Sequence, residues 1–472
     1  MKFLNKKPHM GIFMFVLIVT LITLVASYSI DTSYSYDYLG QYNDGTVLDC
    51  SDKNKRCEKK IISLTTENCD EWYVHQPIEE LQCNMTSKGI EEVSLIADPA
   101  NYVSGKFTNT HYLVEILKKD PIRPRRYKFV PTGFVLLTQE GKKLVKTWDL
   151  EFLPDGSYLV TQKNGRLVHY RDGTFEHVSE LEVLDQNLVG LMGLAIDPEY
   201  EKNNYIYLYY ATSFDNSYPK KDYYLKTRIS RFTYKDGQLF GEKVLLDDIP
   251  GSLFHAGGGL EFGPDGKLYA TTGDAGLPQR SQDIDFLGGK ILRINPDGTI
   301  PSDNPYSNSY VYSRGHRNSQ GLAWHPETLE LYATEHGNWR YDEINLIKKG
   351  GNYGWPSMKC DEVMDQNVPL QGNATFPLKC FKNWTLAPSG AVFVTDKNHP
   401  WYGNLFVAGL RGKHLHRFVM EDNKVVYDEI FFVNIDTQRK SNLDRRIRDV
   451  EFYNGSLWIL SDWSGIAKLT PR

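Results

Sequence analysis

The chain has 472 residues, of which 41% are hydrophobic, and a formal net charge of -5. This length exceeds what one small core organises, so the chain holds either two or three domains or one large repeat architecture. Aromatic residues reach 13% and accompany 38 glycines and 22 prolines, a composition that suits strands separated by tight turns. Both signs of charge are interspersed without a basic stripe, which argues against a nucleic-acid partner.

The N-terminus carries an export signal. Lys2, Lys6 and Lys7 precede an uncharged apolar run from residue 11 to residue 26. The run is shorter than the roughly 20 residues of a spanning helix, and the residues after it form a mediocre cleavage site, so residues 1–30 are either a cleaved signal or a membrane anchor. The lysines precede the run, so the rest of the chain is directed outward in both cases. We therefore expect a secreted or membrane-anchored protein with its folded part on the extracytoplasmic side.

Six cysteines fit an oxidising compartment. Cys360 and Cys380 lie close enough in sequence for a local disulfide, whereas the four earlier cysteines allow three pairings: Cys50, Cys57, Cys69 and Cys83. No Cys-x-x-Cys spacing and no nearby histidine pair support a zinc site. Four Asn-x-Ser/Thr sequons are acceptors in a host that glycosylates exported proteins: Asn84, Asn373, Asn383 and Asn454.

One pattern recurs six times in the rest of the chain. Residues 31–130 show no period and are interpreted as a stalk and a small Cys-containing extension. After them an apolar tripeptide, a turn such as Pro-Asp-Gly and an alternating strand repeat from Trp148, Met192, Gly258, Gln320, Gly390 and Ile447. Each copy reads as a β-hairpin that cannot bury its apolar face alone, and further strand pairs are expected from Arg228, Lys290 and Lys413. About four strands per unit predict an all-β, six-bladed β-propeller over residues 131–472.

Several loops between these hairpins carry polar residues that a plain turn does not require. His255 stands beside a glycine run in FHAGGGLEFGPDG, and blade four contains YSRGHRNSQGLAWHP, EHGNWRYDEINLI and NYGWP. The last blade begins with RRIRDVEF, in which Arg446 and Arg448 alternate and so share one face of a strand. Taken singly, these residues could be a loop histidine and arginines paired with acidic neighbours. Their joint presence favours a site at the end of the central channel.

These strings resemble the soluble quinoprotein glucose and aldose dehydrogenases of the glucose/sorbosone dehydrogenase family, whose segments run HxGGxLxFGPDG, GHRNPQGL, EHGPxxxDEINLI, NYGWP and RxRDV. The resemblance covers about 320 residues in the same order. It implies an enzyme that oxidises an aldose at the anomeric carbon, with pyrroloquinoline quinone and Ca²⁺ as cofactors and an external electron acceptor.

The resemblance also implies roles for individual residues. His255 is the base that takes the proton from the anomeric hydroxyl. Arg317 and Asn318 stabilise the charge that develops on the quinone, and Gln320 supports the same loop. Asp342 orients the catalytic region.

The remaining implied ligands hold the cofactors. Arg411, Arg446 and Arg448 would bind the quinone, because a guanidinium group suits a carboxylate geometrically. Main-chain carbonyls suit Ca²⁺, and the implied metal-binding residues are Gly337 and Asn338 at the catalytic ion and Glu343 at a structural one.

The sequence departs from the family pattern at some of these positions. Val189 and Phe254 stand where sugar-oxidising members place polar residues, and Asn338 replaces a proline. The lost polar groups predict weaker discrimination among aldoses or a less polar substrate. The hedgehog-interacting protein and its relatives share the propeller, so a non-catalytic extracellular propeller that binds a protein or a glycan is the alternative function.

Overall fold

The computed structural model describes residues 146–469 except 219–222, 339, 364–369, 371, 383–384, 400, 432–445 and 463–464; before them it describes Leu144 and the strands β1 to β11. The predictions for residues 1–30, the domain boundary at residue 131, the side chains of the four early cysteines and of Asn84, and the sequon at Asn383 lie outside these residues. Within the described residues, no helix is long and apolar enough to cross a membrane.

The chain divides into two compact units, Met1–Asn84 and Met85–Arg472. The first unit contains the strands β1 (Gln41–Tyr42), β2 (Thr46–Asp49), β3 (Glu58–Ile61) and β4 (Gln82–Asn84). Of these, β1, β2 and β3 form an antiparallel sheet. The second unit begins with short antiparallel strands: β5 (Ile90–Ala97), β6 (Tyr102–Val103), β7 (Lys106–Phe107), β8 (Tyr112–Lys118), β9 (Arg126–Phe129), β10 (Thr138–Gln139) and β11 (Lys142–Lys143).

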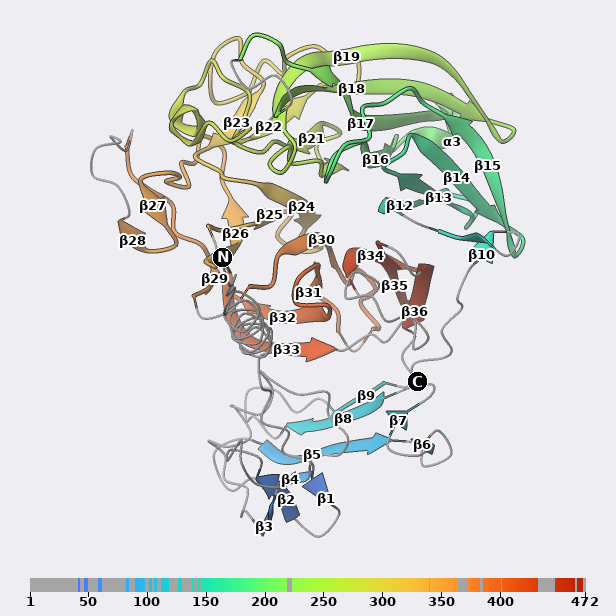
Figure 1. The fold of residues 1–472 in the computed structure, drawn as a ribbon, viewed down its shortest axis with the longest axis vertical. Helices are drawn as coiled ribbons and strands as arrows, with labels where there is room; N and C mark the ends of the chain where they lie inside the picture. The colour runs from blue at the N-terminus through green and yellow to red at the C-terminus, as the bar shows by residue number, and fades with distance from the viewer. Residues whose placement is uncertain are drawn as a thin grey trace, which may run out of the picture. The chain divides into compact units, whose positions relative to one another are not determined.

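Six antiparallel sheets then follow one another around a ring (Figure 1), which confirms the predicted six-bladed β-propeller. The first blade consists of β12 (Thr147–Phe152), β13 (Tyr158–Gln162), β14 (Arg166–Arg171) and β15 (Thr174–Glu180). The second consists of β16 (Leu191–Ile196), β17 (Tyr205–Phe214), β18 (Tyr224–Lys235) and β19 (Gln238–Ser252), with the short helix α3 (Tyr200–Asn203) between its first two strands. The third consists of β20 (Leu260–Phe262), β21 (Leu268–Thr271), β22 (Lys290–Ile294) and β23 (Val311–Arg314), with the 3₁₀ helix η2 (Pro278–Gln282).

The other three blades repeat this plan. The fourth consists of β24 (Ser319–Trp324), β25 (Leu331–Glu335), β26 (Asp342–Ile347) and β29 (Lys379–Phe381), with a small hairpin of β27 (Met358–Lys359) and β28 (Glu362–Val363). The fifth consists of β30 (Pro388–Phe393), β31 (Asn404–Gly409), β32 (Leu415–Glu421) and β33 (Lys424–Phe431). The sixth has three described strands: β34 (Ile447–Tyr453), β35 (Ser456–Ser461) and β36 (Gly465–Leu469).

The six predicted hairpins are the first two strands of the six blades. The first strand of each blade is innermost, and β12 lies beside both β16 and β34, so the ring closes between the first and last blades. Apolar side chains pack across that closure: Leu150 and Val160 of blade one share a buried cluster with Leu460 and Ile466 of blade six. Neighbouring blades therefore bury the faces that a single hairpin would leave in water.

One predicted strand pair was wrong. The segment from Lys290 forms β22 alone, and its partner β23 follows only after a loop of residues 295–310. That loop contains three prolines, Pro296, Pro301 and Pro305, which lack the N–H group that a ladder needs. The disulfide predicted between Cys360 and Cys380 is confirmed, with a Cα–Cα distance of 5.9 Å.

Candidate active site

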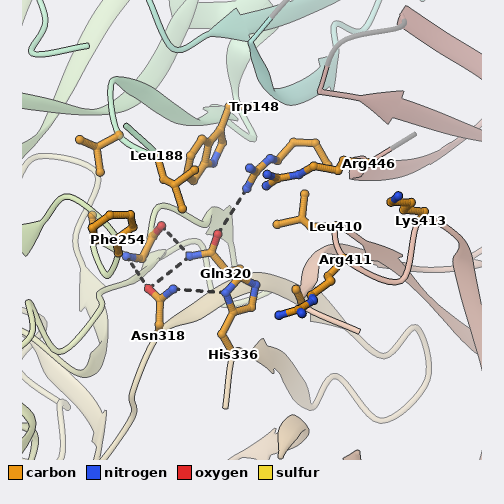
Figure 2. A pocket seen from close by; sticks show the side chains of 15 residues that line it. Trp148, Leu188, Phe254, Asn318, Gln320, His336, Leu410, Arg411, Lys413 and Arg446 are labelled. Carbon is orange, nitrogen blue, oxygen red and sulfur yellow. Dashed lines mark hydrogen bonds between the residues drawn. The ribbon is translucent and has the colours of Figure 1, made fainter. Parts of the chain in front are cut away.

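A cavity of about 420 Å³ lies where the innermost strands begin, a size in the range of small-molecule sites. Side chains of the innermost strands and of the loops that enter the blades line it (Figure 2). The lining residues are Trp148, Leu188, Val189, Phe254, Ala256, Gly257, Asn318, Gln320, His336, Ala387, Leu410, Arg411, Lys413, Arg446 and Arg448. The cavity therefore occupies the end of the ring at which the sequence placed the site.

The glycine run after His255 lets the loop entering blade three approach its neighbours. A Cβ on Gly258 would lie 2.7 Å from the Trp148 ring, and one on Gly259 would lie 2.1 Å from the Gln320 carbonyl oxygen. Gly257 has φ +71°, a conformation that L side chains rarely adopt. These glycines thus serve close packing around the cavity, and Gly257 itself lines it.

Gln320 and Asn318 tie blade four to that loop. Gln320 Nε2 donates to the Gly257 carbonyl over 2.9 Å, and Asn318 Oδ1 accepts from the Gly257 N–H over 3.1 Å. Both side chains are buried and both line the cavity. The amide oxygen of Asn318 is therefore committed to the protein backbone, and Gln320 holds the loop that enters blade three.

His255 is held by a carboxylate that sequence analysis had not singled out. His255 Nδ1 lies 2.7 Å from Asp274 Oδ1, and Gly276 N–H donates to the same oxygen over 2.8 Å. This partner places the ring proton on Nδ1, so the lone pair is on Nε2. Nε2 makes no hydrogen bond within the described part of the chain. The imidazole is 20% exposed and adjoins the cavity through its neighbours Phe254 and Ala256, which line it.

Trp355 connects this pair to Arg317. The indole Nε1 donates to Asp274 Oδ2 over 2.9 Å, and the Arg317 guanidinium lies 5.5 Å from the centre of the same ring. Arg317 Nη1 donates to the His336 carbonyl over 3.2 Å, and its backbone N–H donates to Glu335. Arg317 makes no ion pair within the described residues, so its positive charge is available to an anion beside the base.

His336 lines the cavity near Asn318, Gln320 and Arg411 (Figure 2). Burial, together with Arg317 and Arg448, lowers its pKa to about 3, so the imidazole is neutral at ordinary pH. Its Nε2 is buried and makes no well-formed hydrogen bond within the described part of the chain. The Pro388 backbone also interacts with this imidazole, and His336 lines the cavity as a neutral polar ring.

Arg446 and Arg448 share one carboxylate, Asp462. Arg448 Nε donates to Asp462 Oδ1 over 2.8 Å, and Arg446 Nε lies 2.9 Å from Asp462 Oδ2, close enough for an ion pair although not aligned as a hydrogen bond. Arg448 is 3% exposed and its guanidinium lies 4.3 Å from the Trp148 ring centre. Two cations on one anion leave a net positive charge at the cavity, to which the exposed Arg411 adds.

Asp342 joins two loops beside the cavity. Its Oδ1 accepts from Gly337 N–H over 2.9 Å and its Oδ2 accepts from Ala387 N–H over 2.7 Å. Because Ala387 and His336 line the cavity, Asp342 holds the wall in place without lining it. This geometry suits the positioning role that the resemblance implied.

The implied metal-binding residues lie near Asp342 but outside the cavity lining. The Asn338 carbonyl accepts from Arg340 N–H over 2.9 Å. Glu343 accepts from Cys360 N–H over 2.8 Å and from Asn345 Nδ2 over 3.1 Å, so both of its oxygens have donors. Among the described residues, no group of three or more His, Cys, Asp or Glu could hold a metal ion. Calcium binding at Gly337, Asn338 and Glu343 stays a prediction.

A second cavity of about 40 Å³ shares Trp148, Gln320 and Arg448 with the first. Five carboxylates on innermost strands line it: Asp149, Glu151, Glu261, Asp449 and Glu451. Burial, followed by repulsion from Asp449, raises the pKa of Glu261 to about 8, and burial raises the pKa of Asp449 to about 6. The channel below the candidate site is therefore acidic and partly protonated.

Residues 144–469 match the family described as Glucose / Sorbosone dehydrogenase. The chain belongs to this family. It is 42% identical over 196 residues to quinoprotein glucose dehydrogenase B of Acinetobacter calcoaceticus, an alignment that spans 36% of this chain and 40% of the relative. It is also 32% identical over 135 residues to human hedgehog-interacting protein, covering 25% of this chain and 19% of the relative.

Solved structures show the same propeller. The PQQ-bound form of aldose sugar dehydrogenase from Streptomyces coelicolor superposes with a TM-score of 0.60 at 30% identity, over 71% of this chain and 96% of that one. The family and the fold thus support an oxidoreductase of the sugar dehydrogenase type.

The residues present fit the quinone that this family implies. Pyrroloquinoline quinone is a flat tricarboxylate, and the cavity offers cations at Arg411, Arg446 and Arg448 with the indole of Trp148 beside them. His336 adds a neutral imidazole to the same lining. Positive charge, aromatic surface and a polar ring therefore gather in one cavity.

Proposed function

We propose that this protein oxidises an aldose at its anomeric carbon, with pyrroloquinoline quinone bound in the cavity. One observation carries the proposal: an imidazole oriented by a carboxylate adjoins a cavity lined by arginines. A propeller that only binds a partner does not require His255, Asp274 and the arginines to meet. The family match and the quinone-bound structural neighbour support the same reaction.

His255 acts as the base. Oxidation of an aldose to its lactone removes the proton of the anomeric hydroxyl and the hydrogen of C1 with its electron pair. His255 Nε2 carries the lone pair that takes the proton, because Nδ1 is bonded to Asp274. The buried carboxylate stabilises the imidazolium that forms, and Trp355 fixes that carboxylate from its other oxygen.

The quinone, when bound, supplies the acceptor for the hydride. Arg411, Arg446 and Arg448 would hold its carboxylates, and Asn318 and His336 would face it from blade four. Arg317 lies near the base without a direct ion pair among the described residues, so it would stabilise negative charge that develops in the transition state. Calcium at Gly337 and Asn338 is part of the proposal, and an external acceptor reoxidises the cofactor.

We also propose that the protein is exported and works outside the cytoplasm, tethered or secreted. The Cys360–Cys380 disulfide supports an oxidising compartment. The alternative function, a non-catalytic extracellular propeller, draws support from the match to hedgehog-interacting protein, which covers less of this chain than the matches to the dehydrogenases.

The proposal is tested by turnover. Residues 31–472 are expressed in an oxidising compartment, loaded with calcium and pyrroloquinoline quinone, and assayed for dye reduction with a panel of aldoses. We expect reduction that requires the quinone and falls at least about 100-fold in His255→Ala. Quinone-independent reduction, or equal rates in His255→Ala, would overturn the assignment of the base.

A further inference from the structure

The cavity has two chemically different sides. Figure 2 shows Leu188 and Phe254 on the side away from Arg411, Lys413 and Arg446. The loops that enter blades two and three supply the first side, and blades five and six supply the second. The cations belong to the side assigned to the cofactor, so the other side is the one that a substrate can contact.

Leu188, Val189 and Phe254 form what we name the apolar wall. Leu188 N–H donates to the Leu253 carbonyl over 3.4 Å, which joins the two loops. Backbone hydrogen bonds between Gln186 and Val189 close the first loop into a tight turn. Val189 is buried at 1% exposed and anchors this turn. The wall is therefore a continuous surface built on two fixed loops.

The wall leaves apolar area in water. Leu188 is 37% exposed and Phe254 is 49% exposed, although both border a cavity in which they could be covered. The Phe254 ring lies 6.3 Å from the ring of Tyr223, so one side of it already packs against an aromatic neighbour. Covering the remaining area with hydrocarbon is favourable, whereas covering it with a hydroxyl that finds no partner is not.

We propose that the apolar wall receives one edge of the substrate, and that the substrate is a deoxyaldose. This inference rests on the proposed function. The lining residues on this side carry no polar side chain among the described residues: they are Leu188, Val189, Phe254, Ala256 and Gly257. A sugar hydroxyl turned toward them would lose its water without gaining a side-chain hydrogen bond. A C–H or methyl group in its place would instead bury the wall.

The expected ratio of kcat/KM between a deoxyaldose and D-glucose follows from the discrimination between substrates that apolar pockets reach. Adding or removing one small group against a hydrophobic surface changes kcat/KM by about 10- to 200-fold. We therefore expect at least one of the 2-, 3-, 4- and 6-deoxy derivatives of D-glucose to exceed D-glucose about 10-fold or more in kcat/KM. The preferred derivative identifies the carbon of the sugar that faces the apolar wall.

The test compares two matched variants. Phe254→Asp puts a polar group on the wall, and Phe240→Asp makes the same change at a phenylalanine of β19 that is also 49% exposed but does not line the cavity. The inference predicts that Phe254→Asp reduces the deoxyaldose preference at least about 5-fold while Phe240→Asp leaves it unchanged. Equal preferences in wild type and Phe254→Asp, or D-glucose matching every deoxy sugar, would overturn it.

A binding measurement separates this inference from the proposed function. Calorimetric titration of the wild type and both variants with D-glucose and with each deoxyglucose reports recognition without turnover. If no sugar reduces the dye, but a deoxyglucose binds more tightly than D-glucose and Phe254→Asp removes this difference, the proposed role of the apolar wall is supported and the proposed redox function is contradicted. If sugars are oxidised but no deoxyglucose exceeds D-glucose in kcat/KM or in affinity, the proposed redox function is supported and the proposed role of the apolar wall is contradicted.

Discussion

The indole Nε1 of Trp355 donates a hydrogen bond to Asp274 Oδ2 over 2.9 Å, while the other oxygen of Asp274 holds His255 Nδ1 at 2.7 Å. The face of the same indole lies under the Arg317 guanidinium. One ring from blade four thus orients both the base of blade three and the cation beside it. The reacting groups are positioned by contacts between blades, which explains why the closed ring matters to the chemistry.

Trp355→Phe should move the pH profile of turnover. The change keeps an aromatic ring beneath Arg317 but removes the donor to Asp274, so the carboxylate presents more negative charge to His255 and favours its imidazolium. We expect kcat to fall about 3- to 10-fold, with the acid limb of its pH profile displaced to higher pH. A variant whose profile overlays the wild type would show that Trp355 has only a packing role.

Asp274→Asn should displace the same limb in the opposite direction. Without the carboxylate the imidazolium loses its partner, and an amide can present a donor to Nδ1, which favours the unreactive tautomer. We expect kcat to fall at least about 100-fold while quinone affinity stays within about twofold. Retention of wild-type kcat would contradict the assignment of His255 and Asp274 as a working pair.

Arg448→Met should weaken quinone binding. The variant removes a buried guanidinium that stacks on Trp148 and bonds Asp462, and charged hydrogen bonds contribute about 1.5–3 kcal/mol, so the dissociation constant should rise about 10- to 100-fold. Arg228→Met, which breaks the exposed pair with Asp247, is the control and should bind the quinone normally. Unchanged affinity in Arg448→Met would place the cofactor elsewhere.

The fold followed from the sequence because the repeated hairpin is a local signal. Each copy encodes its own turn and alternation, so six copies predicted six inner hairpins, all of which formed. The long loop after β22 was not predicted from the sequence. Pro296, Pro301 and Pro305 lack the N–H group that a strand ladder needs, but this matters only where a segment would pair, and the sequence did not show which segment pairs with β22. The domain boundary at residue 131 and the pairing of the four early cysteines lie outside the residues that the structure describes.

Part of the site could not be predicted because it consists of partners to the motif residues. Asp274, Glu335 and Asp462 lie at or just after the end of the second strand in three different blades, and each holds a group of the candidate site. Their shared position in the repeat was a usable signal. The pairing of Arg446 and Arg448 with one carboxylate could not be predicted from the sequence, because Asp462 is separated from them by a whole hairpin and comes close only in the folded blade.

Glu261→Gln should stabilise the propeller more at high pH than at low pH. Folding raises the pKa of Glu261 from 4.5 to about 8, so the folded protein favours the protonated carboxyl. The contribution of Glu261 to the free energy of unfolding is therefore present at low pH and is lost as the pH rises through 8, whereas glutamine does not titrate. We expect the Tm of the variant, relative to wild type, to gain about 2–4 °C between pH 5 and pH 9. Exposed Glu176→Gln serves as the control. A pH-independent difference between Glu261→Gln and wild type would refute the raised pKa of Glu261.

Cys360→Ala with Cys380→Ala should destabilise blade four. The disulfide closes a loop with a sequence separation of 20, and removing such a constraint costs about 3 kcal/mol. The double variant should unfold at lower denaturant concentration, and it should still bind the quinone because the disulfide does not line the cavity. Equal stability of the variant and the wild type would show that β29 is held by other contacts.

The most direct test is a titration of the purified protein with pyrroloquinoline quinone in the presence of calcium, followed by absorbance. The account predicts saturation at one quinone per chain in the wild type, the same stoichiometry in His255→Ala, and weakened binding in Arg448→Met. A folded wild-type propeller that binds no quinone would contradict the account and turn attention to the protein- or glycan-binding alternative.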